Sequence, residues 1–195
     1  MRPSTILLAL ALLAIAASTA ASRMMRIGVQ QGYAPAQPIA FSHKLHAGDN
    51  QISCLYCHYG ARTSRHAGIP AASVCMNCHA LLEKQTVDIE RIKETVQLQR
   101  PLIAWVKVHN LPDYVYFNHS RHVLGGVACQ RCHGAVEAME RIEQAMPLTM
   151  GWCLDCHREN AGLPTSSLAR AARRIARAPE PEPGRPGLDC ANCHY

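Results

Sequence analysis

Every cysteine of this chain stands in a C-x-x-C-H motif, in which a histidine directly follows the second thiol, and the motif occurs five times. The paired thiols are Cys54 and Cys57, Cys75 and Cys78, Cys129 and Cys132, Cys153 and Cys156, and Cys190 and Cys193, followed by His58, His79, His133, His157 and His194. This spacing is the attachment signature of haem c, in which two thiols bond to the vinyl groups and the histidine binds iron. The motifs therefore predict five covalently bound haems c.

Two other cofactor chemistries use similar cysteine spacing. Paired C-x-x-C motifs bind zinc, and a single C-x-x-C can form a redox disulfide. Neither chemistry requires a histidine after every second cysteine, so haem attachment is the favoured interpretation. Haem attachment at all five motifs would use every cysteine and leave none for a structural disulfide.

Histidines outside the motifs are numerous enough to fill the sixth position of most of the irons. Six histidines remain once the motif histidines are set aside: His43, His46, His66, His109, His119 and His122. Their number predicts mainly bis-histidine, six-coordinate, low-spin haems. A filled sixth position blocks substrate binding at iron, so we expect an electron carrier and not an enzyme.

An internal repeat organises these ligands. Both phenylalanines open an F-x-H-x-x-H motif, at Phe41 and Phe117, and each motif is followed by two haem motifs at almost the same spacing. His66 lies between the haem motifs of the first repeat and has no counterpart in the second, where Met150 is the candidate closest to Cys153. Met150 is therefore a candidate axial ligand of the fourth haem, or else a packing residue.

The repeat divides the chain into five segments. We expect a signal or membrane anchor (1–25), a first dihaem module (26–79), a connecting helix and linker (80–113), a second dihaem module (114–157) and a terminal segment with the fifth motif (158–195). Helices are predicted over 80–99, 134–145 and 167–178. The last would carry an arginine face, which could be solvated or could meet an acidic partner, anionic lipid or haem propionates. The proline-rich run 179–186 would be a stiff linker.

The N-terminus combines Arg2 with an uncharged apolar run from Ile6 to Ala17 and small residues from Ser18 to Ala21. This pattern indicates export, either by a cleaved signal or with a retained helix. The remaining chain has only two phenylalanines and two tryptophans. We therefore expect a mainly α-helical fold with much irregular structure, whose core is formed by the haems. The formal charge of +6 is roughly cancelled by the propionates, which argues against a nucleic-acid partner.

The F-x-H-x-x-H motifs followed by haem-motif pairs resemble the class III, cytochrome c3/c7-like, multihaem cytochromes. Three further segments, 32–48, 66–70 and 150–153, are similar to the pentahaem cytochrome c subunit of alternative complex III, a bacterial quinol:electron acceptor oxidoreductase. The resemblance covers about residues 26 to 195, although the arginine-rich and proline-rich segments have no match in that family.

This resemblance implies an extracytoplasmic, periplasmic subunit anchored in the bacterial inner membrane by its N-terminal helix. Its partners would be an iron–sulfur subunit, polytopic quinol-oxidising subunits, and a monohaem cytochrome c or terminal oxidase toward which it relays electrons. The chain itself would not bind quinol.

Three alternatives stay open from the sequence. The chain could be an independent periplasmic shuttle of the c3/c7 kind, which a cleaved signal would favour. It could be a catalytic multihaem reductase, although such enzymes need an open distal site and all five motifs are standard. It could also be a tetrahaem-type quinol dehydrogenase cytochrome, for which no quinol site is recognisable.

Overall fold

The structure is a computed structural model that describes residues 3–24, 26–82, 86–98, 103–161 and 189–194. The chain divides into two compact units, residues 1–30 and 31–195. The predicted helix over 167–178 and the proline-rich run lie outside the described residues.

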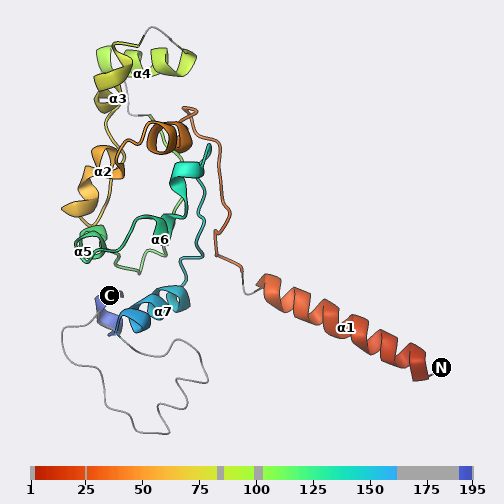
Figure 1. The fold of residues 1–195 in the computed structure, drawn as a ribbon. Helices are drawn as coiled ribbons and strands as arrows, with labels where there is room; N and C mark the ends of the chain where they lie inside the picture. Colours follow the sequence, from red (N-terminus) through yellow and green to blue (C-terminus); the bar gives the residue numbers. More distant parts are fainter. Residues whose placement is uncertain (1–2, 25, 83–85, 99–102, 162–188, 195) are drawn as a thin grey trace. The chain divides into compact units, whose positions relative to one another are not determined.

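The first unit is dominated by one apolar helix, α1 (Pro3–Met24), labelled in Figure 1. Its 22 residues give a length of about 33 Å, enough to cross the roughly 30 Å hydrocarbon layer of a bilayer. All of its side chains are exposed within the chain. Length and composition thus suit either a membrane span or an export signal.

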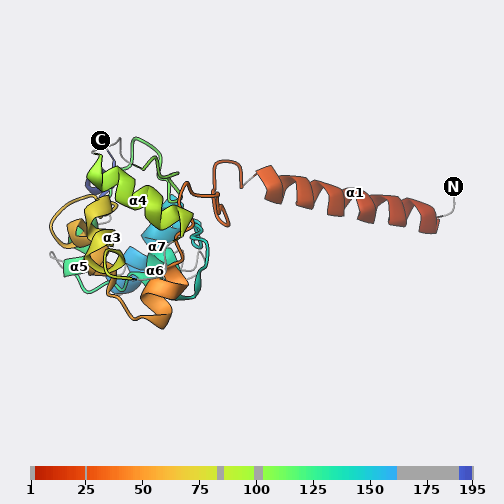
Figure 2. The same ribbon diagram turned by 90° about the horizontal axis from the view of Figure 1, so that it is seen from above.

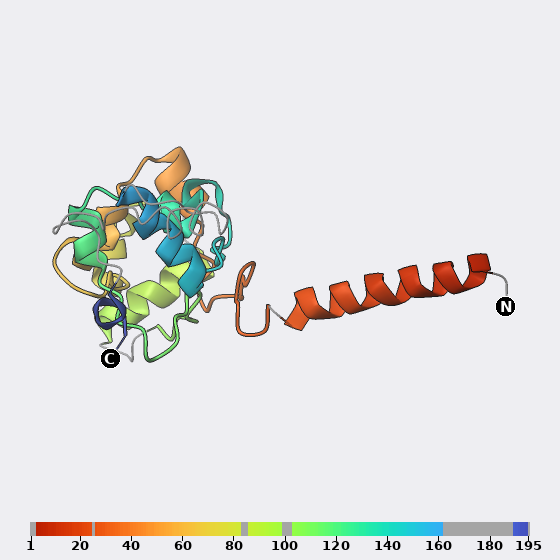
Figure 3. The same cartoon turned by 90° about the horizontal axis from the view of Figure 1, so that it is seen from below.

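The second unit is built from short helical elements joined by irregular segments, which Figure 3 shows from below. The elements are η1 (Lys44–Asp49), α2 (Cys54–Cys57), η2 (Tyr59–Arg62), α3 (Ala72–His79), α4 (Val87–Gln97), α5 (His119–Leu124), α6 (Gln130–His133), η3 (Val136–Ala138), α7 (Met150–Asn160) and η4 (Cys190–Asn192). Among the described residues no strand forms, and the only β-type pairing is an isolated antiparallel bridge between Val115 and His194. The mainly helical, irregular fold predicted from the sequence is confirmed.

Each haem motif lies on or beside one of these short helices. The first and third motifs form single turns, α2 and α6, and the fifth lies on η4. The second motif ends α3, and the fourth lies within α7, which begins at a Thr149 cap whose hydroxyl accepts from Trp152 N. A helical turn brings the two thiols of C-x-x-C to the same side, because residues three apart are neighbours on a helix.

The described residues bury very little apolar surface. The buried hydrophobic side chains are Ile39, Ala61, Ile92, Val108 and Ala161, and the buried polar side chain is Gln144. None of them is aromatic. A unit of this size normally buries a larger core, so the polypeptide alone is a thin wrapping, as expected of a chain whose core is supplied by prosthetic groups.

Two predicted helices differ from the observed ones. The connecting helix starts at Val87 and not near Ala80, because Thr86 caps it by accepting from Ile89 N; it packs beside α3 (Figure 2). The helix predicted over 134–145 is wrong: only the single turn η3 forms there. Gly134 begins that segment at φ 75°, outside the helical region.

The two predicted dihaem modules pack against each other within the second unit. Lys44 N donates to Met139 O, and η1 packs on η3, where Gly48 lies directly against the Glu137 carbonyl. In the opposite direction, His119 N donates to Arg65 O, and α5 packs on η2. Each module thereby positions the H-x-x-H segment of the other.

Candidate haem-binding sites

The two F-x-H-x-x-H segments have nearly identical geometry. The Phe41 ring lies edge-on to His43, with centroids 4.9 Å apart at 85°, and stacks on His46 at 4.3 Å and 26°. Phe117 repeats this arrangement with His119 at 4.9 Å and 86°, and with His122 at 4.5 Å and 29°. One phenylalanine therefore fixes the orientations of two imidazoles, which point in different directions.

Three histidine pairs face each other at a separation that fits a metal between them. The ring centroids are 6.1 Å apart for His46 and His79, 6.3 Å for His119 and His133, and 6.0 Å for His122 and His157. Two metal–nitrogen bonds of about 2.0–2.1 Å and two nitrogen-to-centroid distances of about 1.1 Å add to about 6.3 Å. Each pair joins a motif histidine to an H-x-x-H histidine, so each has the spacing of a bis-imidazole iron site.

By the symmetry of the repeat, we expect the histidine of the first motif to pair with an H-x-x-H histidine as well. His119 pairs with the histidine of the third motif, and its counterpart His43 lies near His58 of the first motif, close enough for His58 to lower the pKa of His43. Ring contacts therefore pair three of the five motif histidines with H-x-x-H histidines, and His58 is close enough to His43 to influence its pKa.

Hydrogen bonds leave the Nε2 atoms of several imidazoles available for a metal. Their Nδ1 atoms bond to carbonyl oxygens: His46 to Ser42 at 2.8 Å, His122 to Asn118 at 2.8 Å, His119 to Arg65 at 2.8 Å, and His58 to Gly68 at 2.7 Å. A backbone acceptor on Nδ1 fixes the tautomer in which Nε2 is the free base. These acceptors are backbone atoms, which no sequence pattern could have revealed.

Burial keeps the imidazoles of His43 and His133 in the neutral form that binds iron. It lowers the pKa of His43 to about 4, with His58, His46 and His109 adding to the effect. It also lowers the pKa of His133 to about 4, with His109 and His119 as the next largest causes. Both side chains are therefore neutral at physiological pH.

The thiols of successive motifs lie close enough to influence one another. All ten cysteines are free. Burial raises the pKa of Cys57, with Cys75 contributing, and raises the pKa of Cys129, to which Cys54 contributes. Burial likewise raises the pKa of Cys132, with Cys156 contributing, and of Cys153, with Cys132 and Cys193 contributing. Each of these contributions comes from a thiol of a different motif.

These residues fit haem c. The chain offers thiol pairs on single helical turns, imidazoles with Nε2 unengaged, and His–His spacings that match an iron site. Among the described residues, two further imidazole nitrogens, Nδ1 of His43 and of His79, are buried without a hydrogen-bond partner. Such atoms are costly in a closed core, and this region would be completed by a group that the polypeptide surrounds.

Three other predicted ligands lie elsewhere: His109 and Met150, described here, and His66, described below. His109 contacts His133 on its Nδ1 side, with Nδ1 and Nε2 3.2 Å apart and ring centroids 4.4 Å apart. Met150 begins α7 and is 65% exposed. The structure brings His122, and not Met150, to His157.

Arg65, the neighbour of His66 in the sequence, connects this loop to the fifth motif through Tyr116. The Arg65 guanidinium lies over the Tyr116 ring, 4.4 Å from its centroid, and Tyr116 N donates to Cys193 O at 2.7 Å. His194 is held from the other side, where its Nδ1 lies 3.3 Å from Tyr114 O and its ring stacks on Tyr114 at 5.7 Å. The contribution of Arg65, Tyr114 and Tyr116 to this region was not anticipated from the sequence.

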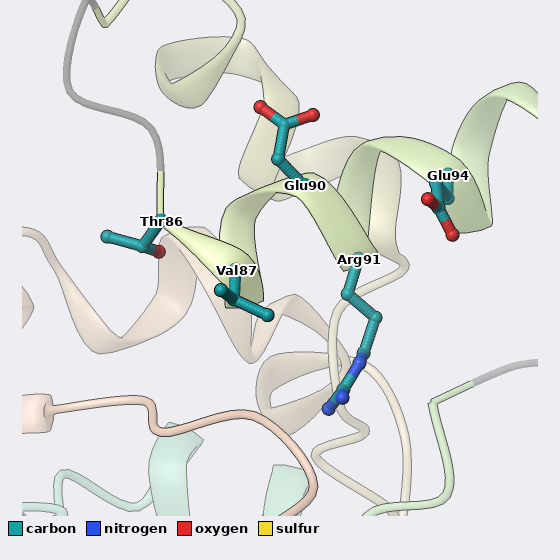
Figure 4. Close-up of a pocket in the computed structure, with 5 residues that line it drawn as sticks. All are labelled: Thr86, Val87, Glu90, Arg91 and Glu94. Carbon is teal, nitrogen blue, oxygen red and sulfur yellow. The ribbon is translucent and has the colours of Figure 1, made fainter.

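A separate surface pocket lies along α4, away from the haem motifs in the sequence. Thr86, Val87, Glu90, Arg91 and Glu94 line it (Figure 4). Arg91 Nη1 donates to Pro38 O at 2.7 Å, and Asp88 Oδ2 accepts from Ala40 N at 3.0 Å. These bonds tie α4 to the segment before Phe41, which gives these α4 residues a structural role. The pocket contains no cysteine or histidine.

Comparisons with known proteins agree with haem c attachment at these motifs. The cytochrome c3 family model matches residues 121–195. The multihaem cytochrome c subunit of a menaquinone reductase from Nitratidesulfovibrio vulgaris is 34% identical over 98 residues, which are 50% of this chain and 45% of that protein. The alignment therefore spans less than half of the curated relative. The C-terminal part of the chain is thus similar to cytochrome c3, and about half of the chain is similar to a multihaem cytochrome c subunit; both likenesses support covalently bound haem c and electron transfer.

Proposed function

We propose that this chain is an extracytoplasmic pentahaem cytochrome c that relays electrons within a membrane-bound quinol-oxidising complex similar to alternative complex III. It would take electrons from an iron–sulfur subunit and pass them toward a monohaem cytochrome c or a terminal oxidase. The three His–His pairs at 6.0–6.3 Å carry this proposal. An iron held on both faces carries electrons and offers no open position to a substrate.

The haems would supply one-electron chemistry, and the chain would supply attachment and ligands. The ten motif cysteines would hold five haems and the motif histidines would be their proximal ligands. As sixth ligands we propose His43 for the first haem, His46 for the second, His119 for the third and His122 for the fourth. For the fifth haem we propose His66, because Arg65 and Tyr116 connect its loop to Cys193.

The residues of this chain would also set the order of the relay. Neighbouring thiols link the second motif to the first through Cys75 and Cys57, and the first to the third through Cys54 and Cys129. The third neighbours the fourth, and the fourth neighbours the fifth through Cys153 and Cys193. We infer an unbranched series in the order second, first, third, fourth, fifth, with the second and fifth motifs at its two ends.

The name of the Nitratidesulfovibrio vulgaris relative supports a second candidate, in which electrons flow toward menaquinone. The same series of attachment sites would serve either direction. Under this candidate a periplasmic donor would reduce the chain, and a membrane partner would oxidise it.

Reduction kinetics on the purified complex distinguish these directions. We expect a short-chain quinol analogue to reduce the haems of the complex, and a quinone-site inhibitor to abolish that reduction. An oxidised soluble cytochrome c should then reoxidise them. Haem reduction by a soluble periplasmic donor, with none from quinol, would support the menaquinone-reducing candidate. Recovery of the chain as a soluble, unpartnered protein would instead indicate an independent shuttle.

A further inference from the structure

His109 occupies a position that an axial ligand of the third haem could not have. Its ring centroid is 4.4 Å from that of His133, whereas an iron between two imidazoles requires about 6.3 Å. The position across an iron from His133 is already taken by His119, at 6.3 Å and with the two rings nearly parallel at 13°. His109 therefore lies on the side of His133 that faces away from the proposed iron.

The two rings meet through the nitrogens that form a hydrogen bond. Nδ1 of His133 and Nε2 of His109 are 3.2 Å apart. With its Nε2 reserved for iron, neutral His133 must carry its proton on Nδ1 and can only donate. Nε2 of His109 then accepts, so that His109 carries its own proton on Nδ1. A neutral His109 in this tautomer has no free nitrogen lone pair for any iron.

The segment around His109 is held firmly in place. Val108 is 7% exposed. Asn110 N donates to Oε1 of Gln144 at 3.2 Å. The Gln144 side chain is itself 1% exposed, and its backbone bonds to Tyr33 O and to Gly32 N. Further along, Gln37 exchanges two amide hydrogen bonds with the backbone of Val106, both 2.9 Å.

We propose that His109 is a positioning residue that accepts a hydrogen bond from the proximal ligand His133 and makes that imidazole more electron-rich than the imidazoles that donate to backbone carbonyls. This inference rests on the proposed haem at Cys129–His133. The Nδ1 bonds described for His46, His58, His119 and His122 end on backbone carbonyls. An imidazole nitrogen is a far stronger base than a carbonyl oxygen, so it draws the Nδ1 proton further. The extra electron density on His133 stabilises ferric iron and lowers the reduction potential of this haem.

Two substitutions at His109 test this role in the holoprotein. His109→Leu removes the acceptor, whereas His109→Gln offers an amide oxygen like the carbonyls used elsewhere. In a potentiometric titration followed by EPR, we expect His109→Leu to raise one of the haem potentials. Loss of the hydrogen-bond partner of a metal ligand typically changes metal affinity or activity by about tenfold or more. A tenfold change in the preference of this haem for ferric over ferrous iron would shift its potential by about 59 mV for one electron. His109→Gln should raise the same potential by less, and every haem should stay low-spin in both variants.

The competing outcomes are distinct. A new high-spin haem in either variant would show that His109 is an axial ligand and would overturn the proposal. Unchanged potentials in both variants would overturn it as well. The intact mass of each variant shows whether all haems are attached. A wild-type protein without a haem at Cys129 and Cys132 would instead refute the proposed function on which the inference rests.

Discussion

The imidazoles of His46 and His122 are each oriented by two contacts, one with a phenylalanine ring and one with a backbone carbonyl. His46 stacks on Phe41 and bonds to Ser42 O, and His122 stacks on Phe117 and bonds to Asn118 O. Both carbonyls lie four residues before the histidine, so each short segment orients its own ligand. This explains why the F-x-H-x-x-H spacing recurs intact in both halves of the chain.

The fourth haem offers the sharpest residue-level prediction. We expect His122→Ala to leave its iron without a sixth ligand, because His122 lies across from His157. One haem should then become high-spin in EPR and in the visible spectrum. Met150→Ala is the matched control, since its side chain is exposed, and it should leave all haems low-spin. Loss of a near-infrared His–Met band in Met150→Ala, with no change in His122→Ala, would restore Met150 as the ligand.

The histidine candidates could be read from the sequence, but their roles depend on tertiary contacts. The repeat predicted His43, His46, His119 and His122 as a group of ligands, and in the structure three of them lie opposite motif histidines. Whether His109 faces a nitrogen or an iron depends on how Val108 and Gln144 hold its segment against α6. Met150 was chosen because it is close to Cys153 in the sequence, whereas the structure brings His122 to His157 from a separate helix, α5.

At the level of elements, the contact between η1 and η3 joins the two halves of the haem-binding unit. Gly48 on η1 has no side chain, and a Cβ atom there would collide with the Glu137 carbonyl of η3. The pair is reinforced by Glu140, whose carboxylate accepts from Ser42 Oγ at 2.7 Å and pairs with Lys44 at 3.2 Å. The hydrogen bonds from Ser42 and Lys44 both lower the pKa of Glu140.

Gly48→Ala should destabilise the holoprotein, because a backbone carbonyl cannot move aside as a flexible side chain can. We expect a loss of about 1–3 kcal/mol in the free energy of unfolding, typical of overpacking. Gly151→Ala is the matched control: nothing lies within 4 Å of its added Cβ, and it is helical in α7. It should be neutral or stabilising by about 0.5–1 kcal/mol. Equal denaturation midpoints in urea for the two variants would contradict the close contact.

The sequence predicted a helix correctly where no long-range backbone hydrogen bonds compete with the helical ones. It failed where such bonds form. The connecting helix had regularly spaced apolar residues, and Ile92 is indeed buried on it. The run 134–145 was also predicted to be helical. There, however, Gly134 turns at positive φ, Met139 O accepts from Lys44 N of the other half, and Gln144 bonds to Tyr33 and Gly32. These long-range backbone bonds replace the helical ones.

On the scale of the whole molecule, the N-terminal helix decides whether the haem unit is tethered. We predict that α1 is retained as a membrane anchor, because its 22 residues, most of them apolar, suffice for a span. N-terminal sequencing of the protein purified from membranes should then begin at or near Met1. A sequence beginning near Ala21 or Ser22, with the protein released into the soluble fraction, would show that the segment is a cleaved signal.

The small apolar core makes the whole unit dependent on its prosthetic groups. Five buried hydrophobic side chains in the described residues cannot offset the conformational entropy of ordering such a unit. The composition already indicated this shortage, since a chain with two phenylalanines and two tryptophans has few large side chains to bury. We expect that changing both thiols of one motif to serine lowers the yield of folded protein, besides removing one haem.

The central claim, that five haems c are covalently attached to this one chain, is tested most directly by the intact mass of the mature protein under denaturing conditions. We expect a mass that exceeds that of the polypeptide by five haems, with the haem retained after acid–acetone extraction. A mass corresponding to four or fewer haems, or to the bare polypeptide with bound zinc, would contradict it.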